Sequence, residues 1–314
     1  MAYKIIDLGA RNGNFSRAAA INDCGQIVGA TGNSAYPDTP ASPAPFLWAQ
    51  GVMTLLSLPA PARYGQALAL NKFQQVVGSI YNGTADKAVI WTNGSYAQLP
   101  FPGDGPAARG ISDCGFVVGE GGAPPAGNTQ AYSTQNGLIH LQPIPPTPPN
   151  VLPTDRYARA YAINNVGQVV GGSDTGTPIP FPKAYAPPVP GIHAVLWENG
   201  MVTDLGPLHP GEGSEAYGIN DRGQVVGRSG NRAILWNNSA KTDLGPGAAL
   251  GINNAGTIIG DSFLWRPNGR VTLASLLPPS SGWSNLTGAD INDRGEVVGT
   301  GTHNGQTRAF LLVP

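Results

Sequence analysis

The stretch Ile219-Asn220-Asp221-Arg222-Gly223-Gln224-Val225-Val226-Gly227 decides the fold, because versions of it recur along the chain. Each copy has an apolar residue, a polar turn, two adjacent apolar residues and a closing glycine. Seven copies follow one another at steps of 49, 41, 52, 56, 33 and 39 residues, and they occupy residues 21–29, 70–78, 111–119, 163–171, 219–227, 252–260 and 291–299. A unit that returns at this spacing indicates a repeat architecture.

Each copy predicts a β-hairpin. The residues on either side of the turn form extended runs too short for helices. Asn and Asp favour the turn because their side chains bond their own backbone, and Gly supplies a positive φ. Gln74 replaces this glycine in the second copy. A non-glycine residue there costs roughly 1 kcal/mol, so we expect that turn to be either strained or different in shape.

A second hairpin follows each copy. Its first strand carries a recurring Trp, and in several copies its second strand ends in Asp-Leu or Asp-Leu-Gly. The recurring tryptophans are Trp48, Trp91, Trp197, Trp236 and Trp265. Four short strands in a unit of this length are typical of a propeller blade. We therefore predict an all-β, seven-bladed β-propeller that forms one domain over residues 1–314, with these tryptophans in its core.

The two ends of the chain predict how the last blade is completed. Residues 3–9 match the fourth strand of a blade, whereas residues 308–312 match the third. The N-terminal strand would then supply the strand that the seventh blade lacks. Such pairing leaves no open sheet edge where the chain starts and stops.

The pattern Ile-Asn-x-x-Gly-Gln-Val-Val-Gly, followed by His193-Ala194-Val195-Leu196-Trp197 and a later Asp-Leu-Gly, resembles the HAF extracellular repeat family of bacteria. The resemblance covers nearly the whole chain and implies a secreted or surface-attached protein. It implies no catalytic residues, because the motif defines none. Its His occurs here only as His193, and other residues take that place elsewhere, namely Ala44, Lys87, Gln130, Arg232 and Arg308. The chain enters a strand directly after Met1 without a signal peptide, so a cytoplasmic location also stays open.

Composition narrows the classes of partner. Charged residues make up 12% of the chain and the net charge is −1, so we expect no nucleic-acid binding. No run of 18 apolar residues occurs, so we expect no membrane insertion. Cys24 and Cys114 fill the same turn position two blades apart, and we expect both to be free thiols.

The connections between hairpins vary in length, whereas the hairpin turns are uniformly short. The long connections are Thr31–Ala44, Glu120–Gln130, Pro143–Arg159, Gly172–Ile192, Pro207–Ser214 and Ala274–Thr287. In a propeller they share one face, and variable loops on a rigid scaffold are common binding sites. Gly172–Ile192 combines six prolines with Phe181 and Tyr185. We interpret it either as a rigid aromatic wall for a ligand or as a loop that proline stiffens for packing.

Charged residues in the first strand of the blades are the candidate site residues, because the other copies have mainly small neutral residues there. They are Arg17, Arg109, Arg159, Glu215 and Asp290. We predict that they lie at the mouth of a central channel, where the arginines would grip a small polar or anionic ligand. Pairing of Arg159 with Glu215 is the alternative. Trp283 follows Ser280-Ser281-Gly282, so we expect an exposed loop residue able to stack on a sugar ring.

These features predict a non-catalytic binding or adhesion module for a glycan, a peptide or a small polar ligand. We expect no cofactor and no metal, because the four histidines, His140, His193, His209 and His303, have no metal-ligand spacing. One alternative is a propeller glycoside hydrolase or lyase that uses Glu215 or Asp290, since such enzymes need two carboxylates about 5–9 Å apart. Another is a structural subunit of a surface assembly.

Overall fold

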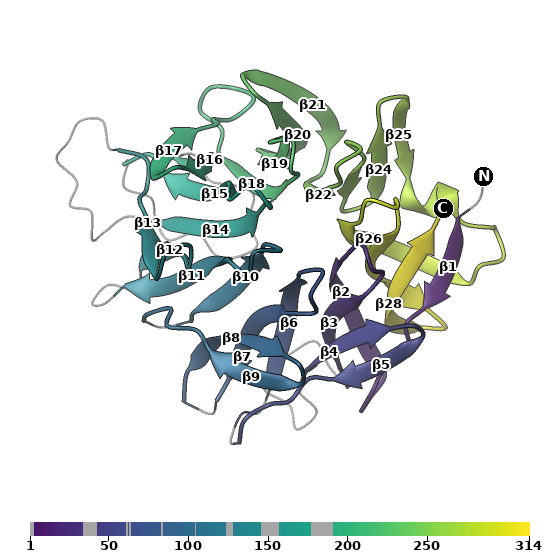
Figure 1. The fold of residues 1–314 in the computed structure, drawn as a ribbon. Coiled ribbons are helices and arrows are strands. Elements are labelled where there is room, and N and C mark those ends of the chain that lie inside the picture. Colours follow the sequence, from purple (N-terminus) through teal and green to yellow (C-terminus); the bar gives the residue numbers. More distant parts are fainter. Residues whose placement is uncertain are drawn as a thin grey trace. The chain divides into compact units, whose positions relative to one another are not determined.

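A computed structural model describes residues 3–33, 43–60, 62, 64–82, 84–103, 105–123, 128–145, 157–176 and 191–314. These residues form seven antiparallel sheets of four strands each, so the predicted seven-bladed, all-β propeller is confirmed. In six blades the four strands follow one another in the chain, whereas the last blade combines strands from both ends of the chain. Within each blade the strands lie side by side (Figure 1).

The contacts within the chain divide it into two compact units, and each is described by itself. The first unit joins Met1–Leu99 with Leu250–Pro314, and the second comprises Pro100–Ala249. The first therefore contains blades one, two, six and seven, and the second contains blades three, four and five. The expectation of one domain over residues 1–314 stays a prediction.

The first unit has the following elements. Blade one consists of β2 (Phe15–Ile21), β3 (Ile27–Gly32), β4 (Ala44–Ala49) and β5 (Val52–Leu55). Blade two consists of β6 (Tyr64–Leu70), β7 (Val76–Tyr81), β8 (Asp86–Thr92) and β9 (Ser95–Gln98). Blade six consists of β22 (Ala249–Ile252), β23 (Ile258–Gly260), β24 (Phe263–Arg266) and β25 (Gly269–Thr272), and the short 3-10 helix η2 (Leu273–Leu276) follows it.

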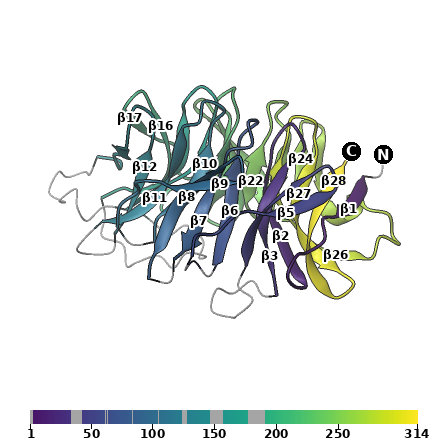
Figure 2. The same ribbon diagram turned by 60° about the horizontal axis from the view of Figure 1, so that its bottom comes forward.

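Blade seven combines both ends of the chain. Its strands are β26 (Trp283–Ile291), β27 (Val297–His303), β28 (Gln306–Val313) and β1 (Lys4–Asp7). β1 pairs antiparallel with β28, with Ile5 opposite Leu312 and Ile6 opposite Leu311. Figure 2 shows β1 beside β28 from a second direction. The prediction that the N-terminal strand completes the last blade is confirmed.

The second unit has the following elements. Blade three consists of β10 (Ala107–Ile111), β11 (Val117–Ala123), β12 (Asn128–Ser133) and β13 (Ile139–Leu141). Blade four consists of β14 (Ala158–Ile163), β15 (Val169–Asp174), β16 (Ile192–Glu198) and β17 (Met201–Asp204). Blade five consists of β18 (Ser214–Ile219), β19 (Val225–Ser229), β20 (Arg232–Asn237) and β21 (Ala240–Pro246).

The asparagine of the repeat does more than shape its own turn. Asn220 Oδ1 accepts hydrogen bonds from the backbone N–H groups of Arg222 and Gln224, at 3.1 and 3.0 Å. The side-chain amide of Asn164 donates across the blade boundary to the backbone carbonyl of Asn220, at 3.0 Å. The same bond between neighbouring blades joins Asn22 to Asn71, Asn253 to Asn292 and Asn292 to Asn22. The buried asparagine therefore links each of these turns to the next blade.

The turn of the second copy keeps the shape of the others. Gln74 has a φ of 62°, in the left-handed region that glycine occupies in the other copies, such as Gly223 at 74°. Its backbone N–H still bonds the carbonyl of Asn71, at 3.3 Å. Of the two expected outcomes, the strained turn is therefore correct.

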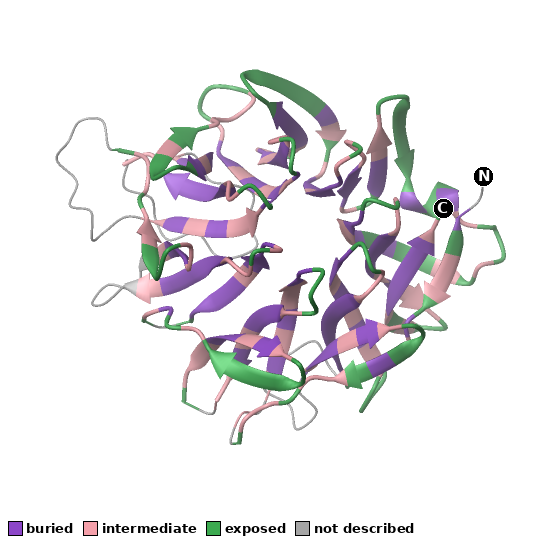
Figure 3. Cartoon of the chain, viewed as in Figure 1, coloured by how far each residue is buried: buried purple, intermediate pink, exposed green. Residues whose placement is uncertain are grey.

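The repeated tryptophans lie between blades. Trp48, Trp91, Trp197 and Trp236 are buried, as predicted, whereas Trp265 is half-buried. Three indole N–H groups donate to a backbone carbonyl of the preceding blade: Trp91 to Ser57, Trp197 to Gln142 and Trp236 to Gly206. The fourth strands are far more exposed than the three inner strands (Figure 3). Both predicted free thiols, Cys24 and Cys114, are free and exposed.

Candidate functional site

A β-bulge interrupts the first strand of six blades. At the bulge, the pairing register with the second strand skips one residue of the first strand. This residue lies two positions before the Ile or Leu of the repeat. The residues passed over are Ala19, Leu68, Arg109, Tyr161, Tyr217 and Ala289. A bulge turns the side chain of its extra residue in a new direction. In the second unit these side chains are large and polar, and they start the candidate site.

Two arginines share one buried carboxylate. Glu120 follows the glycine that ends the third repeat, and its side chain is 7% exposed. Arg109 Nη2 donates to Glu120 Oε1 at 2.5 Å within blade three. Arg159 Nε of blade four lies 2.9 Å from Glu120 Oε2, as an ion pair without the alignment of a hydrogen bond. The carboxylate thus ties two neighbouring blades together.

A second carboxylate is held by two tyrosines. The hydroxyl of Tyr161 donates to Glu215 Oε1 and that of Tyr217 donates to Oε2, each at 3.1 Å. The two rings meet edge to face, with centroids 5.4 Å apart. Burial raises the pKa of Glu215 and outweighs the two hydroxyl bonds, which favour the charged form. A Cβ atom on Gly172 would lie 3.1 Å from Glu215 Cγ, so glycine leaves room for this side chain.

Aromatic rings lie against both guanidinium groups. The Arg109 guanidinium is 5.5 Å from the ring centre of Tyr161, and that of Arg159 is 5.3 Å from the ring centre of Tyr157. These distances suit cation–π attraction. Burial raises the pKa of Tyr157 and of Tyr161, so both hydroxyls remain protonated donors at neutral pH. We call Arg109, Glu120, Tyr157, Arg159, Tyr161, Glu215 and Tyr217 the Arg–Glu–Tyr cluster.

The cluster leaves buried polar atoms unsatisfied. Arg109 Nε, Arg159 Nε and Glu120 Oε2 are buried and have no hydrogen-bond partner among the described residues. Native proteins satisfy nearly all such groups with protein, ordered water or a ligand. Arg159 Nε and Glu120 Oε2 already face each other as an ion pair, so Arg109 Nε marks the place where an additional polar group would be stabilised.

The structure brings together three of the five predicted charged residues. Arg109, Arg159 and Glu215 belong to the cluster in the second unit. The alternative was a pairing of Arg159 with Glu215, but the ion pair of Arg159 is made with Glu120. Glu120 was missed because it lies on a second strand, whereas the search covered first strands. It pairs with Ala107, which has the position that Arg159 and Glu215 have in blades four and five.

Arg17 and Asp290 lie in the first unit and have other partners. Arg17 Nη2 donates to Gln66 Oε1 of the neighbouring blade. Asp290 accepts hydrogen bonds from the backbone N–H groups of Ile21 and Ile291, at 3.0 and 2.8 Å. Desolvation raises the pKa of Asp290 to about 6, against the effect of these two bonds. Asp290 therefore joins blade seven to blade one, and the channel-mouth placement of the five residues stays a prediction.

Trp283 was expected to be an exposed loop residue, and this expectation is wrong. Trp283 begins strand β26 and is half-buried. Its ring stacks on the imidazole of His303 with centroids 4.6 Å apart and planes 2° apart, and it meets Phe310 edge-on at 5.9 Å. One aromatic face is therefore already covered by the protein.

Other expectations fall partly or wholly outside the described residues. These are the proline-rich loops with Phe181 and Tyr185, and the central parts of Thr31–Ala44, Glu120–Gln130 and Pro143–Arg159. Within the described ranges, His, Cys, Asp and Glu form no group of three that could hold a metal ion. In the same ranges no helix is long and apolar enough to cross a membrane.

Known proteins resemble this chain in fold alone. Models of known protein families and curated protein sequences give no match. The β-propeller domain of the Trilobed protease from Pyrococcus furiosus aligns over 95% of both chains, with a TM-score of 0.58 and 9% identity. YCF48 bound to D1 peptide aligns over 100% of this chain and 97% of its own, with a TM-score of 0.53 and 12% identity. Acylaminoacyl peptidase from Pyrococcus horikoshii aligns over 94% of this chain with a TM-score of 0.52 and 7% identity, and this chain spans 52% of that protein.

Proposed function

We propose that the protein is a non-catalytic binding module and that the Arg–Glu–Tyr cluster holds a carboxylate of a peptide ligand. The observation that carries this proposal is the buried Nε of Arg109, which has no hydrogen-bond partner among the described residues and lies near the charge of Arg159. A guanidinium presents five N–H donors in a planar fork that fits a carboxylate through two bonds. Glu120 uses only part of that capacity.

Charge also favours an anionic group. Arg109, Arg159 and Glu120 together carry one net positive charge, because one carboxylate faces two guanidinium groups. Glu215 accepts hydrogen bonds from the two tyrosine hydroxyls, and the charge of Arg159 also acts on it. A ligand carboxylate beside Arg109 and Arg159 would balance the net charge of Arg109, Arg159 and Glu120 and would give Arg109 Nε an acceptor. The surrounding tyrosine rings would exclude water and strengthen these bonds.

A peptide is preferred to a glycan for two reasons. The tryptophan expected to stack on a sugar is already stacked on His303. Among proteins of the same fold, YCF48 was solved with the D1 peptide, which supports peptide binding as a use of this architecture. The resemblance of the repeat to HAF proteins supports an extracellular or surface location, where the protein would bind or adhere to a partner.

The test compares matched arginine variants on one peptide array and one glycan array. We expect selective binding of peptides that present a free carboxylate. Arg109→Ala should weaken that binding about tenfold to a hundredfold, the effect of losing hydrogen bonds to a charged group. Arg17→Ala is the control, because Arg17 occupies a first strand in the other unit and bonds Gln66. Binding of glycans alone, or equal losses in both variants, would refute the proposal.

A second candidate function is a hydrolase or lyase. Its specific support is the raised pKa of Glu215, a property of general acids, with Glu120 as a second carboxylate in the cluster. Glu215→Gln separates the two functions. For a binding module the variant still binds the ligand carboxylate, since Arg109 and Arg159 remain and the change removes an acidic group from the cluster. For an enzyme it abolishes release of products from a glycan panel.

A further inference from the structure

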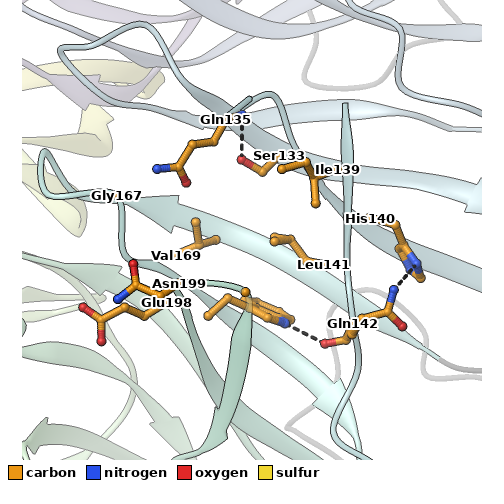
Figure 4. Close-up of a pocket in the computed structure, with 12 residues that line it drawn as sticks. Ser133, Gln135, Ile139, His140, Leu141, Gln142, Gly167, Val169, Glu198 and Asn199 are labelled. Atoms are coloured by element: carbon orange, nitrogen blue, oxygen red, sulfur yellow. Dashed lines mark hydrogen bonds between the residues drawn. The ribbon is translucent and has the colours of Figure 1, made fainter. Parts of the chain in front are cut away.

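The second unit contains a pocket that does not involve the Arg–Glu–Tyr cluster. It lies where the hairpin turns of blade four meet the last two strands of blade three, and its volume is about 140 Å³. Turn residues Gly167, Asn199 and Gly200 form part of its wall (Figure 4). The sequence predicted binding on the connections between hairpins, whereas this pocket is built from the uniformly short turns.

The floor of the pocket is apolar. Leu141 of β13, Val169 of β15 and Trp197 of β16 contribute to its lining. Ile139 and Leu141 point to one side of β13, whereas His140 points to the other (Figure 4). The indole N–H of Trp197 is bonded to the carbonyl of Gln142 at 2.7 Å, so the rest of its ring offers carbon surface. A cavity of roughly 150 Å³ holds one benzene ring, so this pocket suits one aromatic or branched aliphatic side chain.

Exposed apolar residues lie in or next to the pocket lining along the chain. The large exposed hydrophobic residues described in the second unit are Leu138, Ile139, Val166 and Met201. Ile139 lines the pocket itself, and each of the others directly precedes or follows a lining residue in the chain. An exposed apolar side chain that lines a pocket, as Ile139 does, is typical of an interaction site.

The charge of the lining residues indicates which charge the partner carries near the pocket. Glu198 is the carboxylate among the lining residues, and no Lys or Arg lines the pocket. Its Oε1 accepts a hydrogen bond from Gln168 at 2.9 Å, which holds the side chain beside the turn. The amides of Gln135 and Asn199 add neutral donors and acceptors for a peptide backbone.

We propose that this pocket docks a peptide segment that inserts one aromatic or branched aliphatic side chain and places a cationic side chain beside Glu198. The site is independent of the cluster proposed to bind a carboxylate. The two sites would therefore select side chains of opposite charge.

The test titrates three capped tetrapeptides into the full chain labelled with carbon-13 at its Leu and Val methyl groups. The probes are Gly-Phe-Arg-Gly, Gly-Phe-Glu-Gly and Gly-Ala-Arg-Gly, and the Leu141 and Val169 methyl signals report binding. We expect saturable shifts with Gly-Phe-Arg-Gly. Binding of Gly-Ala-Arg-Gly should be at least about tenfold weaker, because the buried ring is lost. Binding of Gly-Phe-Glu-Gly should be about threefold weaker, the effect of an exposed ion pair, and Glu198→Gln should remove that difference.

A matched pair of surface variants ties the shifts to the pocket. Ile139→Trp crowds the rim and should abolish them, whereas Val271→Trp should leave them unchanged. Val271 has the same position in blade six and nearly the same exposure, 38% against 40% for Ile139. Equal melting temperatures of the two variants exclude unfolding as the cause. The proposal is overturned if no probe saturates the Leu141 and Val169 shifts, if the Phe-Glu probe binds as tightly as the Phe-Arg probe, or if both variants lose binding equally.

Discussion

The imidazole Nδ1 of His193 lies 2.9 Å from Oδ2 of Asp204, across strands β16 and β17. Arg232 and Asp243 occupy the same two positions in blade five, 2.5 Å apart, and Arg308 and Asp7 occupy them in blade seven, 3.9 Å apart. The aspartate also accepts a hydrogen bond from the glycine two residues later, at 2.7 Å from Gly206 to Asp204. A basic side chain at the start of the third strand and the aspartate of Asp-Leu-Gly at the end of the fourth therefore form one contact within a blade.

This double role predicts unequal effects of the two partners on stability. Asp204→Ala removes both the contact with His193 and the acceptor for the Gly206 N–H, and we expect the free energy of unfolding to fall by about 1–2 kcal/mol. His193→Ala removes only the exposed pair and should cost less than about 1 kcal/mol. Urea unfolding of both variants checks this. Equal losses would mean that the turn bond contributes nothing.

The left-handed turn at Gln74 predicts a stabilising substitution. Gln74→Gly removes the steric cost of a positive φ, but glycine loses more conformational entropy on folding, which offsets part of the benefit. We expect the free energy of unfolding to rise by about 0.5–1 kcal/mol. Gly223→Gln makes the opposite change in the equivalent turn and should destabilise by about 1 kcal/mol. Thermal melting of both variants measures the two shifts. A loss of stability in Gln74→Gly would contradict the strain.

Asp290 predicts a pH dependence of stability. Its folded pKa of about 6 lies above the ordinary value of 3.8, so between these values the folded state binds more protons than the unfolded state. The free energy of unfolding should therefore fall as pH rises through this window, by roughly 1–3 kcal/mol for a half-buried group. Urea unfolding between about pH 4 and about pH 7 measures the slope.

The comparison with Asp290→Asn isolates this contribution. Burial also raises the pKa of Glu215, which adds a slope of the same sign to both proteins. The difference between the wild-type and variant curves should therefore carry the Asp290 effect, with the variant losing less stability as pH rises. Parallel curves would show that Asp290 titrates alike in the folded and unfolded states.

The two tryptophan environments predict different costs of truncation. Trp197→Ala removes a buried ring and an inter-blade hydrogen bond, so we expect a loss of about 3–5 kcal/mol. Trp283→Ala removes a half-buried ring stacked on His303 and should cost about 1–2 kcal/mol. Denaturant unfolding ranks the two. A larger loss for Trp283 would place the more important packing at the end of β26.

The sequence by itself determined the blades, their number and the strand that completes the last one. Each hairpin depends on local chemistry: the asparagine bonds its own turn, the glycine takes a positive φ, and apolar residues flank both. Comparing each end of the chain with the repeat showed that residues 3–9 match a fourth strand and residues 308–312 match a third. β1 pairs with β28, as this comparison predicted. Local patterns of this kind need no knowledge of distant contacts.

The tertiary structure alone decided which polar side chains meet. Glu120 joins Arg109 and Arg159 because strand pairing places it opposite Ala107 and because blade four packs on blade three. The bulges that redirect Arg109, Tyr161 and Tyr217 depend on how two strands align, which no single residue encodes. The pocket beside Leu141 and Val169 likewise lies between two blades. Partners far apart in the chain are selected by packing and by burial of charge, and these act only once the sheets have assembled.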